Sequence, residues 1–336
     1  MKVLIVAEKP AVSRCIAPVA RRHWPDAGIT FVHAVPYGNI RFSYPRGLKF
    51  DQYPLLSEPR DKLAPWDEWV CAPVRLSADG ELAPGAMSHE LFTSADVIVC
   101  ACDPDHTVAV GFEVLMRQVF GDARALDCPT LVLHSLDTAS IEKAFTNLQP
   151  VREAYAHSFE YGRTKRYFDW NWNVNSLVIL NDAQRRAGAP ADAPPMSKYA
   201  LQLLYGLRNQ VPMMEGRMVH LMQNWLGTGR YKSEPGEWRP RLGSAASVIP
   251  IIENLLFAGF LEPTVVAGRA HLGLSARGRS LLGLLHPDCE DADLPFRLHA
   301  WCEQGMVSKR AIDRYINSFF GKQKRFLART THQDAE

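Results

Sequence analysis

The sequence predicts an α/β domain, in which helices flank a parallel sheet, followed by a mainly helical domain. Apolar runs at 2–7, 95–102 and 131–134 are each followed by a segment of helical periodicity. Such runs are typical of strands buried on both faces of a parallel sheet. The alternation of strands with helices is typical of α/β folds. From residue 150 onward the pattern is almost entirely helical.

The first domain is expected to hold three helices, at 12–23, 108–120 and 138–147. Pro10 stands where it can open the first helix, because proline is favoured at the first helical position. Residues 24–90 are rich in Pro, Gly and aromatic residues, and we expect short strands and loops there.

The second domain is expected to be mainly helical, with one small winged-helix-like part. Its first helices span 152–180, 197–209 and 215–225. The winged-helix-like part consists of a helix, two strands and a helix, at 247–259, 260–266, 271–274 and 275–285. We therefore predict three parts of the chain, at 1–150, 151–305 and 306–336, the last being a basic C-terminal extension.

The composition is that of an ordinary globular protein. The 336 residues are 47% hydrophobic and 22% charged, and the formal net charge of +2 does not by itself indicate nucleic acid. The seven cysteines are odd in number and form no C-x-x-C pair, which argues against a disulfide framework or a structural zinc site. The sequence has neither the shape of a signal peptide nor a long apolar span, so we expect a cytoplasmic protein without membrane contact.

Three acidic residues follow two of the predicted strands. Glu8 comes directly after the first strand, and Asp103 and Asp105 come directly after the strand at 95–102. Ligands bind at the carboxyl ends of parallel strands, so the three carboxylates are expected to form one catalytic and metal-binding site. Carboxylate oxygens suit Mg²⁺, which can stabilise charge on a phosphodiester. An Asp-x-Asp pair can also be an ordinary loop feature, but its combination with Glu8 favours function.

The opening residues, VLIVAEKPAVSRCIA at 3–17, resemble the opening of type IA DNA topoisomerases, especially those of the topoisomerase III kind. This resemblance implies a topoisomerase–primase (TOPRIM) domain, in which the glutamate is paired with an Asp-x-Asp-x-Glu motif. Here the second motif reads Asp103-Pro104-Asp105-His106-Thr107. Both aspartates match, whereas His106 stands in place of the arginine of the family and Thr107 in place of its third acid.

A second stretch, YGRTKRYFDWNWNVN at 161–175, is similar to the family helix that carries paired basic residues. The resemblance implies that Lys165 and Arg166 contact DNA phosphate, with Asp169 as a supporting residue. Phosphate contacts position a strand without reading its sequence. A solvated basic helix face is the alternative. Trp170 and Trp172 are expected to stack on bases or to pack in the core.

The predicted DNA-binding set also includes Lys9 and Arg163, which lie in the same two matching stretches. The resemblance covers most of residues 1–305, but it joins two family segments whose middle is missing. That middle carries the strand-passage domains and the catalytic tyrosine of the family. Tyr231, between Arg230 and Lys232, is a tentative replacement nucleophile, and a surface or structural tyrosine is the alternative.

Three functions follow as hypotheses. The first is a topoisomerase-like protein that binds single-stranded DNA, holds Mg²⁺ and does not relax DNA alone, unless a partner chain supplies the missing domains. The second is a metal-dependent nuclease or nickase that uses water as the nucleophile. A nucleotidyl transferase is the third and lacks support in the surrounding residues. The basic stretch 309–329, with aromatic residues among its charges, indicates either a nucleic-acid or partner surface or a helix packed on the body.

Overall fold

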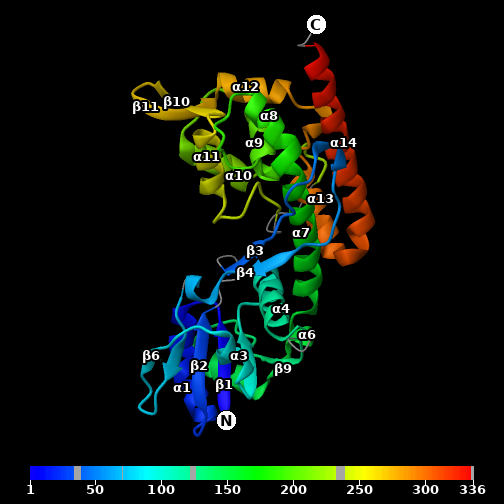
Figure 1. Ribbon diagram of the computed structural model, residues 1–336. Coiled ribbons are helices and arrows are strands. Elements are labelled where there is room, and N and C mark those ends of the chain that lie inside the picture. The colour runs from blue at the N-terminus through cyan, green and yellow to red at the C-terminus, as the bar shows by residue number, and fades with distance from the viewer. Residues whose placement is uncertain (34–38, 70, 122–125, 232–238, 334–336) are drawn as a thin grey trace. The chain divides into compact units, whose positions relative to one another are not determined.

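The structure is a computed structural model, in which the chain folds into two compact units. Unit 1 comprises residues 1–44 and 60–163, and unit 2 comprises residues 45–59 and 164–336. The residues that the structure describes are 1–33, 39–69, 71–121, 126–231 and 239–333. Figure 1 shows the course of the chain and the element labels.

Unit 1 is built on a seven-stranded sheet with the strand order β6-β5-β2-β1-β7-β8-β9. The strands β2, β1, β7 and β8 run parallel, whereas β5 joins β2, β6 joins β5 and β9 joins β8 in antiparallel fashion. The sheet is therefore mixed and mainly parallel. The strands are β1 (Lys2–Ala7), β2 (Gly28–His33), β5 (Val74–Leu76), β6 (Leu82–Pro84), β7 (Val97–Ala101), β8 (Pro129–Thr130) and β9 (Gln149–Pro150).

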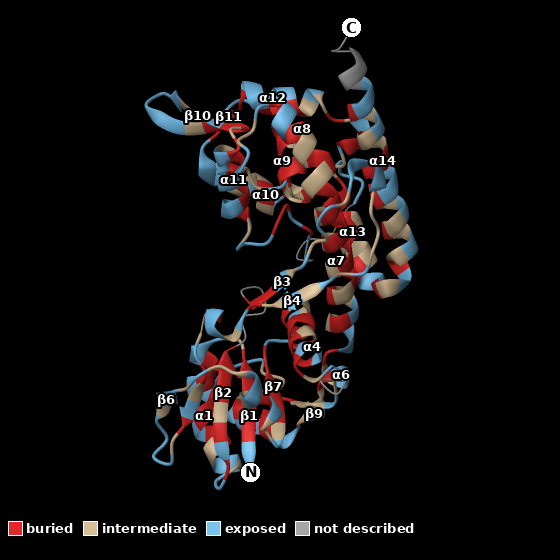
Figure 2. Ribbon diagram, in the orientation of Figure 1, coloured by how far each residue is buried: buried red, intermediate tan, exposed pale blue. Residues whose placement is uncertain are grey.

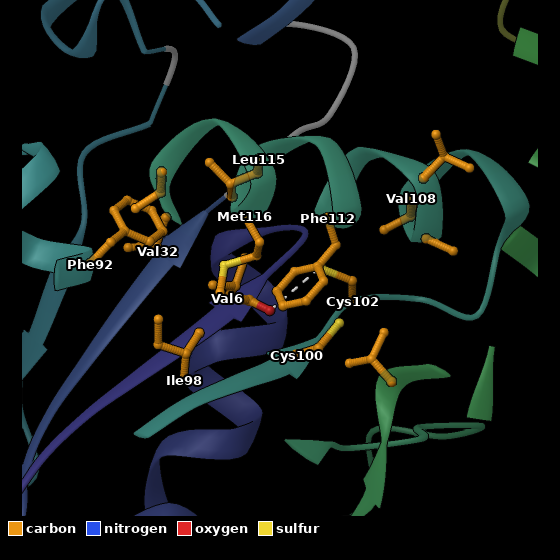
Figure 3. Packing of buried hydrophobic residues seen from close by; sticks show 14 of the residues in the cluster. Val6, Val32, Phe92, Ile98, Cys100, Cys102, Val108, Phe112, Leu115 and Met116 are labelled. Atoms are coloured by element: carbon orange, nitrogen blue, oxygen red, sulfur yellow. Dashed lines mark hydrogen bonds between the residues drawn. The ribbon is translucent and has the colours of Figure 1, made fainter. Parts of the chain in front are cut away.

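Helices cover both faces of this sheet. Successive side chains of a strand point to opposite faces, and in β1 the side chains on both faces are apolar. On β1, Val3 and Ile5 pack with α1 (Pro10–His23) and α5 (Thr138–Thr146). Leu4 and Val6 instead belong to the core under α4 (His106–Phe120) and α3 (His89–Thr93), which Figure 3 shows around Phe112 and Met116. A separate antiparallel pair of β3 (Ile40–Phe42) and β4 (Asp61–Leu63) and the short α6 (Val151–Ala154) complete unit 1.

Two predicted elements differ from those observed. The strand expected at 131–134 is not observed: the two-residue β8 ends at Thr130, and only Leu131 N continues its ladder, donating to Cys100 O over 2.8 Å. The chain then leaves the sheet for Asp137, which caps α5 by accepting from Ser140 N. The single helix expected at 152–180 is divided at Tyr155, whose buried hydroxyl donates to Cys102 O over 2.7 Å.

The helix α7 (Ala156–Asn175) begins in unit 1 and ends in unit 2. In unit 1 it approaches α4 closely at Gly162, where a Cβ atom would lie 2.3 Å from His106 O. Only glycine allows this approach of helix to backbone.

Unit 2 is mainly helical, with a π-helical turn at Ser176–Leu180 directly after α7 and one antiparallel hairpin. The hairpin pairs β10 (Leu261–Val266) with β11 (Arg269–Leu274), and an isolated antiparallel bridge joins Met213 to Leu272 of β11. The other helices are α8 (Asn181–Arg186), α9 (Lys198–Leu207), α10 (Glu215–Gln223), α11 (Val248–Phe257), α12 (Ala276–Gly283), α13 (Leu294–Gln304) and α14 (Lys309–Gln333). Within the described ranges, no helix combines the length and the apolar character needed to cross a membrane.

The segment 45–59 belongs to unit 2 although it is far from the rest of that unit in sequence. Two buried asparagines of α7 hold its backbone. Asn175 accepts from Leu55 N and donates to Leu55 O, both over 2.7 Å. Asn171 accepts from Ser57 N over 2.9 Å and donates to Ser57 O over 3.0 Å. Each asparagine side chain thus satisfies one backbone N–H and one backbone C=O of the segment, as a neighbouring strand would do in a sheet.

We expect Asn171→Ala to lower the free energy of unfolding by about 1–3 kcal/mol, because a partly buried backbone N–H and C=O lose their partner. Chemical denaturation measures this loss, and limited proteolysis should detect faster cleavage within residues 45–59. Asn209→Ala, at an exposed position of unit 2, is the matched control. Equal stability of the two variants would contradict the role assigned to Asn171.

Candidate functional site

Two of the three predicted acids lie together at the carboxyl edge of the sheet. The parallel register pairs Ala7 at the end of β1 with Ala101 at the end of β7. Glu8 leaves β1 directly after this pair, and Asp103 follows β7 two residues later. The side chains of Glu8 and Asp103 are in hydrogen-bond contact. As expected from the shared edge of parallel strands, the carboxyl groups of Glu8 and Asp103 lie together.

Two charged carboxylates this close repel each other, and a proton or a nearby cation relieves that repulsion. Partial burial, and next the hydrogen bond with Asp103, raise the pKa of Glu8. Lys9 offsets part of this effect, because its Nζ lies 3.0 Å from Glu8 Oε1. Lys9 is 62% exposed, and the hydrogen bond with Glu8 raises the pKa of its ammonium group. The site is therefore a pair of carboxyl groups, Glu8 and Asp103, in which Glu8 takes up a proton more readily than usual and Lys9 lies beside it.

Asp105 has a different role in the structure. Its side chain caps α4, accepting from Thr107 N over 2.7 Å and from Val108 N over 3.4 Å. An aspartate at this position satisfies the open N–H groups of the first helical turn. Its second oxygen lies 3.7 Å from the Nδ1 atom of His106. In the described part of the chain, no three acidic, histidine or cysteine residues form a group that could hold a metal ion.

The chemistry of the acid pair nevertheless fits Mg²⁺. This ion keeps several of its water molecules and is bound in many proteins through only one or two carboxylates. Glu8 and Asp103 provide two such groups, on neighbouring strands of a rigid sheet. His106 and Thr107, which replace the arginine and the third acid of the resembling family, lie in the first turn of α4.

The predicted DNA-binding residues of α7 form ion pairs within the protein. In unit 1, Arg163 binds Glu113, with its Nη2 atom 2.6 Å from an oxygen of that carboxylate, and the Glu113 side chain is only 5% exposed. Arg163 therefore neutralises an otherwise unfavourable buried charge. In unit 2, Lys165 Nζ lies 2.7 Å from an oxygen of Asp169, and Arg166 is half-buried.

Asp169 stands between two lysines from different helices. Burial alone would raise its pKa, but the charges of Lys165 and Lys198 outweigh this effect and lower it. Lys198 lies on α9 and forms an ion pair with the same carboxylate. Burial lowers the pKa of Lys198, and Asp169 counteracts that change. This trio links α7 to α9 within unit 2, so Asp169 and Lys165 both contribute to holding the two helices together.

The aromatic candidates differ in exposure. Trp170 and Trp172 are fully buried, with their indole N–H groups donating to Ser57 Oγ and Met196 O. The expectation that one of them could stack on bases is therefore wrong for both, because their rings lie in the core of unit 2. Tyr231 is 39% exposed, and its ring stacks on Phe296 at a centroid distance of 5.4 Å. Lys232, its predicted cationic neighbour, lies outside the described residues.

A buried serine–histidine pair was not predicted. Ser13 Oγ lies 2.8 Å from His33 Nε2, and His33 Nδ1 lies 3.3 Å from Ala72 O. A carbonyl can only accept, so Nδ1 carries the proton and Nε2 accepts from the serine hydroxyl. His33 ends β2 beside Ala7, which puts the pair at the same sheet edge as Glu8. No local pattern could reveal it, because its members lie 20 residues apart on different elements.

Comparison with known proteins gives no further guide to the site: no protein-family model matches the chain, and no curated protein matches it significantly. The assignment of function therefore depends on the residues and on their geometry.

We expect the stability of the protein to fall as the pH is lowered below about 6.5, the ordinary pKa of histidine. Burial lowers the pKa of His33, so in this range the unfolded chain binds a proton that the folded chain does not. His33→Gln should remove this part of the pH dependence. At pH 8 it should cost about 1–3 kcal/mol through lost buried hydrogen bonds.

Urea denaturation between pH 5 and pH 8 measures both effects. His134→Gln, at an exposed position of unit 1, is the control and should keep the profile of the wild type. A His33→Gln variant with an unchanged pH profile would refute the assignment of a neutral, structural imidazole.

Proposed function

We propose that the protein is a DNA-binding protein of the type IA topoisomerase-like TOPRIM kind, with an Mg²⁺ site in unit 1. The observation that carries the proposal is the contact between Glu8 and Asp103 at the ends of two adjacent parallel strands. This is the position where parallel sheets bind ligands. The residues around it carry the resemblance to this family in sequence, and the mixed, mainly parallel sheet is consistent with it.

Glu8 and Asp103 would hold the ion. When bound, Mg²⁺ would supply positive charge for the oxygens of a phosphodiester. Lys9, exposed beside Glu8, would contact a neighbouring phosphate. Asp105 keeps the first turn of α4 in place and thereby fixes the loop that carries Asp103. Because the family's third acid is replaced by Thr107 and its tyrosine domain is missing, we propose that the chain alone does not relax DNA.

A winged-helix part in unit 2 is the finer fold proposal. Its support is the order α9, Met213, α10, α11, β10 and β11, together with the antiparallel bridge from Met213 to β11. In a winged helix, a short first strand joins the hairpin in this way. The part would help to position DNA, as DNA-binding winged helices do.

A metal-dependent nuclease or nickase is the second candidate. The specific observation in its favour is the hydrogen-bonded carboxyl pair, because Glu8, with its raised pKa, can hold a proton near the site. Water would then take the place of the tyrosine as nucleophile. Tyr231 has no comparable support, since its ring stacks on Phe296.

We expect Asp103→Asn to weaken Mg²⁺ binding by about 10–100-fold, a loss that even indirect partners of metal ligands can cause. Isothermal titration of Mg²⁺ into the purified full chain measures this change. Glu90→Gln, at an exposed position of unit 1, is the control and should bind like the wild type. A wild-type chain that binds no Mg²⁺ would overturn the metal site.

The same variants decide between the two candidate functions. Supercoiled plasmid and labelled single strand are incubated with Mg²⁺, with Mn²⁺ or with EDTA. Retention of the single strand without scission supports the binding protein, whereas nicks that require metal and vanish in Asp103→Asn establish the nuclease. A wild-type chain without affinity for single strands at low salt would overturn the DNA proposal, because phosphate contacts are strongest there.

A further inference from the structure

The long helix α14 is amphipathic, and its apolar side is buried in unit 2. Phe319 and Phe320 contact the ring of Trp172 at centroid distances of 4.8 and 5.2 Å. Figure 2 shows exposed positions along the helix beside buried ones. The buried side of α14 consists of Ile312, Ile316, Phe319, Phe320 and Leu327. The predicted packing of the aromatic residues on the body is thus observed, and it leaves the opposite side of α14 facing solvent.

The solvent side of α14 carries four exposed arginines, Arg310, Arg314, Arg325 and Arg329. With 3.6 residues per turn, they fall within a sector of about 100° around the helix axis. The other positions in this sector, Ala311, Ser318, Gly321 and Ala328, are small and uncharged. Among the described residues, none of the four guanidinium groups has an ion-pair or hydrogen-bond partner. We call these four residues the arginine face.

The lysines of α14, by contrast, are used inside unit 2. Lys309 pairs with Glu58, and Lys322 pairs with Asp288. Lys324 donates to Asp51 O over 2.8 Å and to Tyr53 O over 2.7 Å. These contacts attach the segment 45–59 along one border of the arginine face and residues 287–289 along the other. The lysines thus pair with Glu58 and Asp288 and bind the backbone carbonyls of Asp51 and Tyr53, and within the described residues the arginines of the face have no acidic partner.

The dimensions and chemistry of this face match a nucleic-acid strand. From Arg310 to Arg329 the helix rises about 28 Å, which corresponds to about eight nucleotides at 3.4 Å each. Guanidinium groups bind phosphate through paired hydrogen bonds and are more weakly hydrated than ammonium groups. The face has no acid that would repel a phosphate chain.

An exposed aromatic ring at the border favours a single strand over a duplex. Phe50, in the segment 45–59, is 37% exposed, and its ring centroid lies 5.6 Å from Lys324 Nζ. It therefore lies at the border of the arginine face that Lys324 marks. Proteins that bind single strands combine a cationic track for the backbone with aromatic rings on which bases stack.

We propose that the arginine face binds the phosphate backbone of single-stranded DNA, with Phe50 as a stacking platform for a base. The proposal rests on the proposed DNA-binding function and deepens it by assigning the strand to a surface that does not involve the acid pair. Binding here needs no metal ion, because the arginines themselves supply the positive charge.

The test compares quadruple variants of the full chain. Arg310, Arg314, Arg325 and Arg329 are all changed to alanine, and binding of a labelled 20-nucleotide single strand is followed by fluorescence anisotropy between 50 and 200 mM salt in EDTA. We expect the affinity to fall by more than tenfold at 50 mM salt. The slope of log K against log salt should fall by about 3, since four phosphate contacts each contribute about 0.7.

Three further variants make the result specific. The matched control changes four exposed arginines outside α14 and outside the winged-helix part, Arg22, Arg60, Arg75 and Arg185, to alanine and should lose little affinity. The same four positions of α14 changed to lysine keep the charge and should retain most of the binding, even if the alanine variant is poorly folded. Phe50→Ala should weaken binding of the single strand more than binding of a duplex of equal length.

Several outcomes would overturn the inference. One is that the alanine and control quadruple variants lose affinity equally. Another is that the alanine variant keeps DNA binding but loses binding to vesicles of anionic phospholipid, which would assign the face to a lipid surface. If the wild type binds single strands and the alanine variant binds them equally well, only this inference fails. If the wild type binds no DNA, the proposed function fails with it.

Discussion

The parallel ladder between β1 and β7 is the constraint on which the candidate site depends. Its register sets Ala7 beside Ala101, and the residues that follow leave the sheet at one edge. Alternate side chains of both strands are buried under helices on opposite faces, so a slip by one residue would exchange side chains of different size between two close-packed cores. The packing of the two cores thus favours the observed register, and this register brings Glu8 and Asp103 together.

In unit 2 the comparable constraint is the polar surface of α7. Asn171 and Asn175 hold the segment 45–59, and Asp169 joins Lys165 to Lys198. These groups are buried or half-buried, so each needs its partner to remain favourable. A basic and polar helix that resembles a DNA-binding helix in sequence therefore uses much of its polarity to hold its own fold.

Local rules predicted the elements well where one segment determines its own structure. The β-branched run of β1 and Pro10 at the start of α1 both act within a few residues. The acid pair was also predictable, because the ends of parallel strands share an edge. The use of Asp105 as a helix cap was not, since a carboxylate after a strand and before a helix suits either role.

Partners far apart in sequence account for most of what was missed. Asn175 and Leu55 are 120 residues apart, and Ser13 and His33 belong to different elements. The antiparallel edges of the sheet depend on strands of two or three residues, which are too short to show a period of two. The burial of Trp170 and Trp172 likewise depends on which segments cover them, and periodicity along α7 does not specify that.

The distribution of charge gives the two proposed sites different roles. An acid pair repels a phosphate chain unless a cation is present, and Lys9 offsets only one of its charges. Affinity for a strand must therefore come from cations elsewhere. Most lysines of α14 and the basic residues of α7 form bonds within the fold, whereas the four arginines of α14 do not. A strand held by these arginines would be retained without metal, and Mg²⁺ at Glu8 and Asp103 would govern only the chemistry of a phosphate that reaches it.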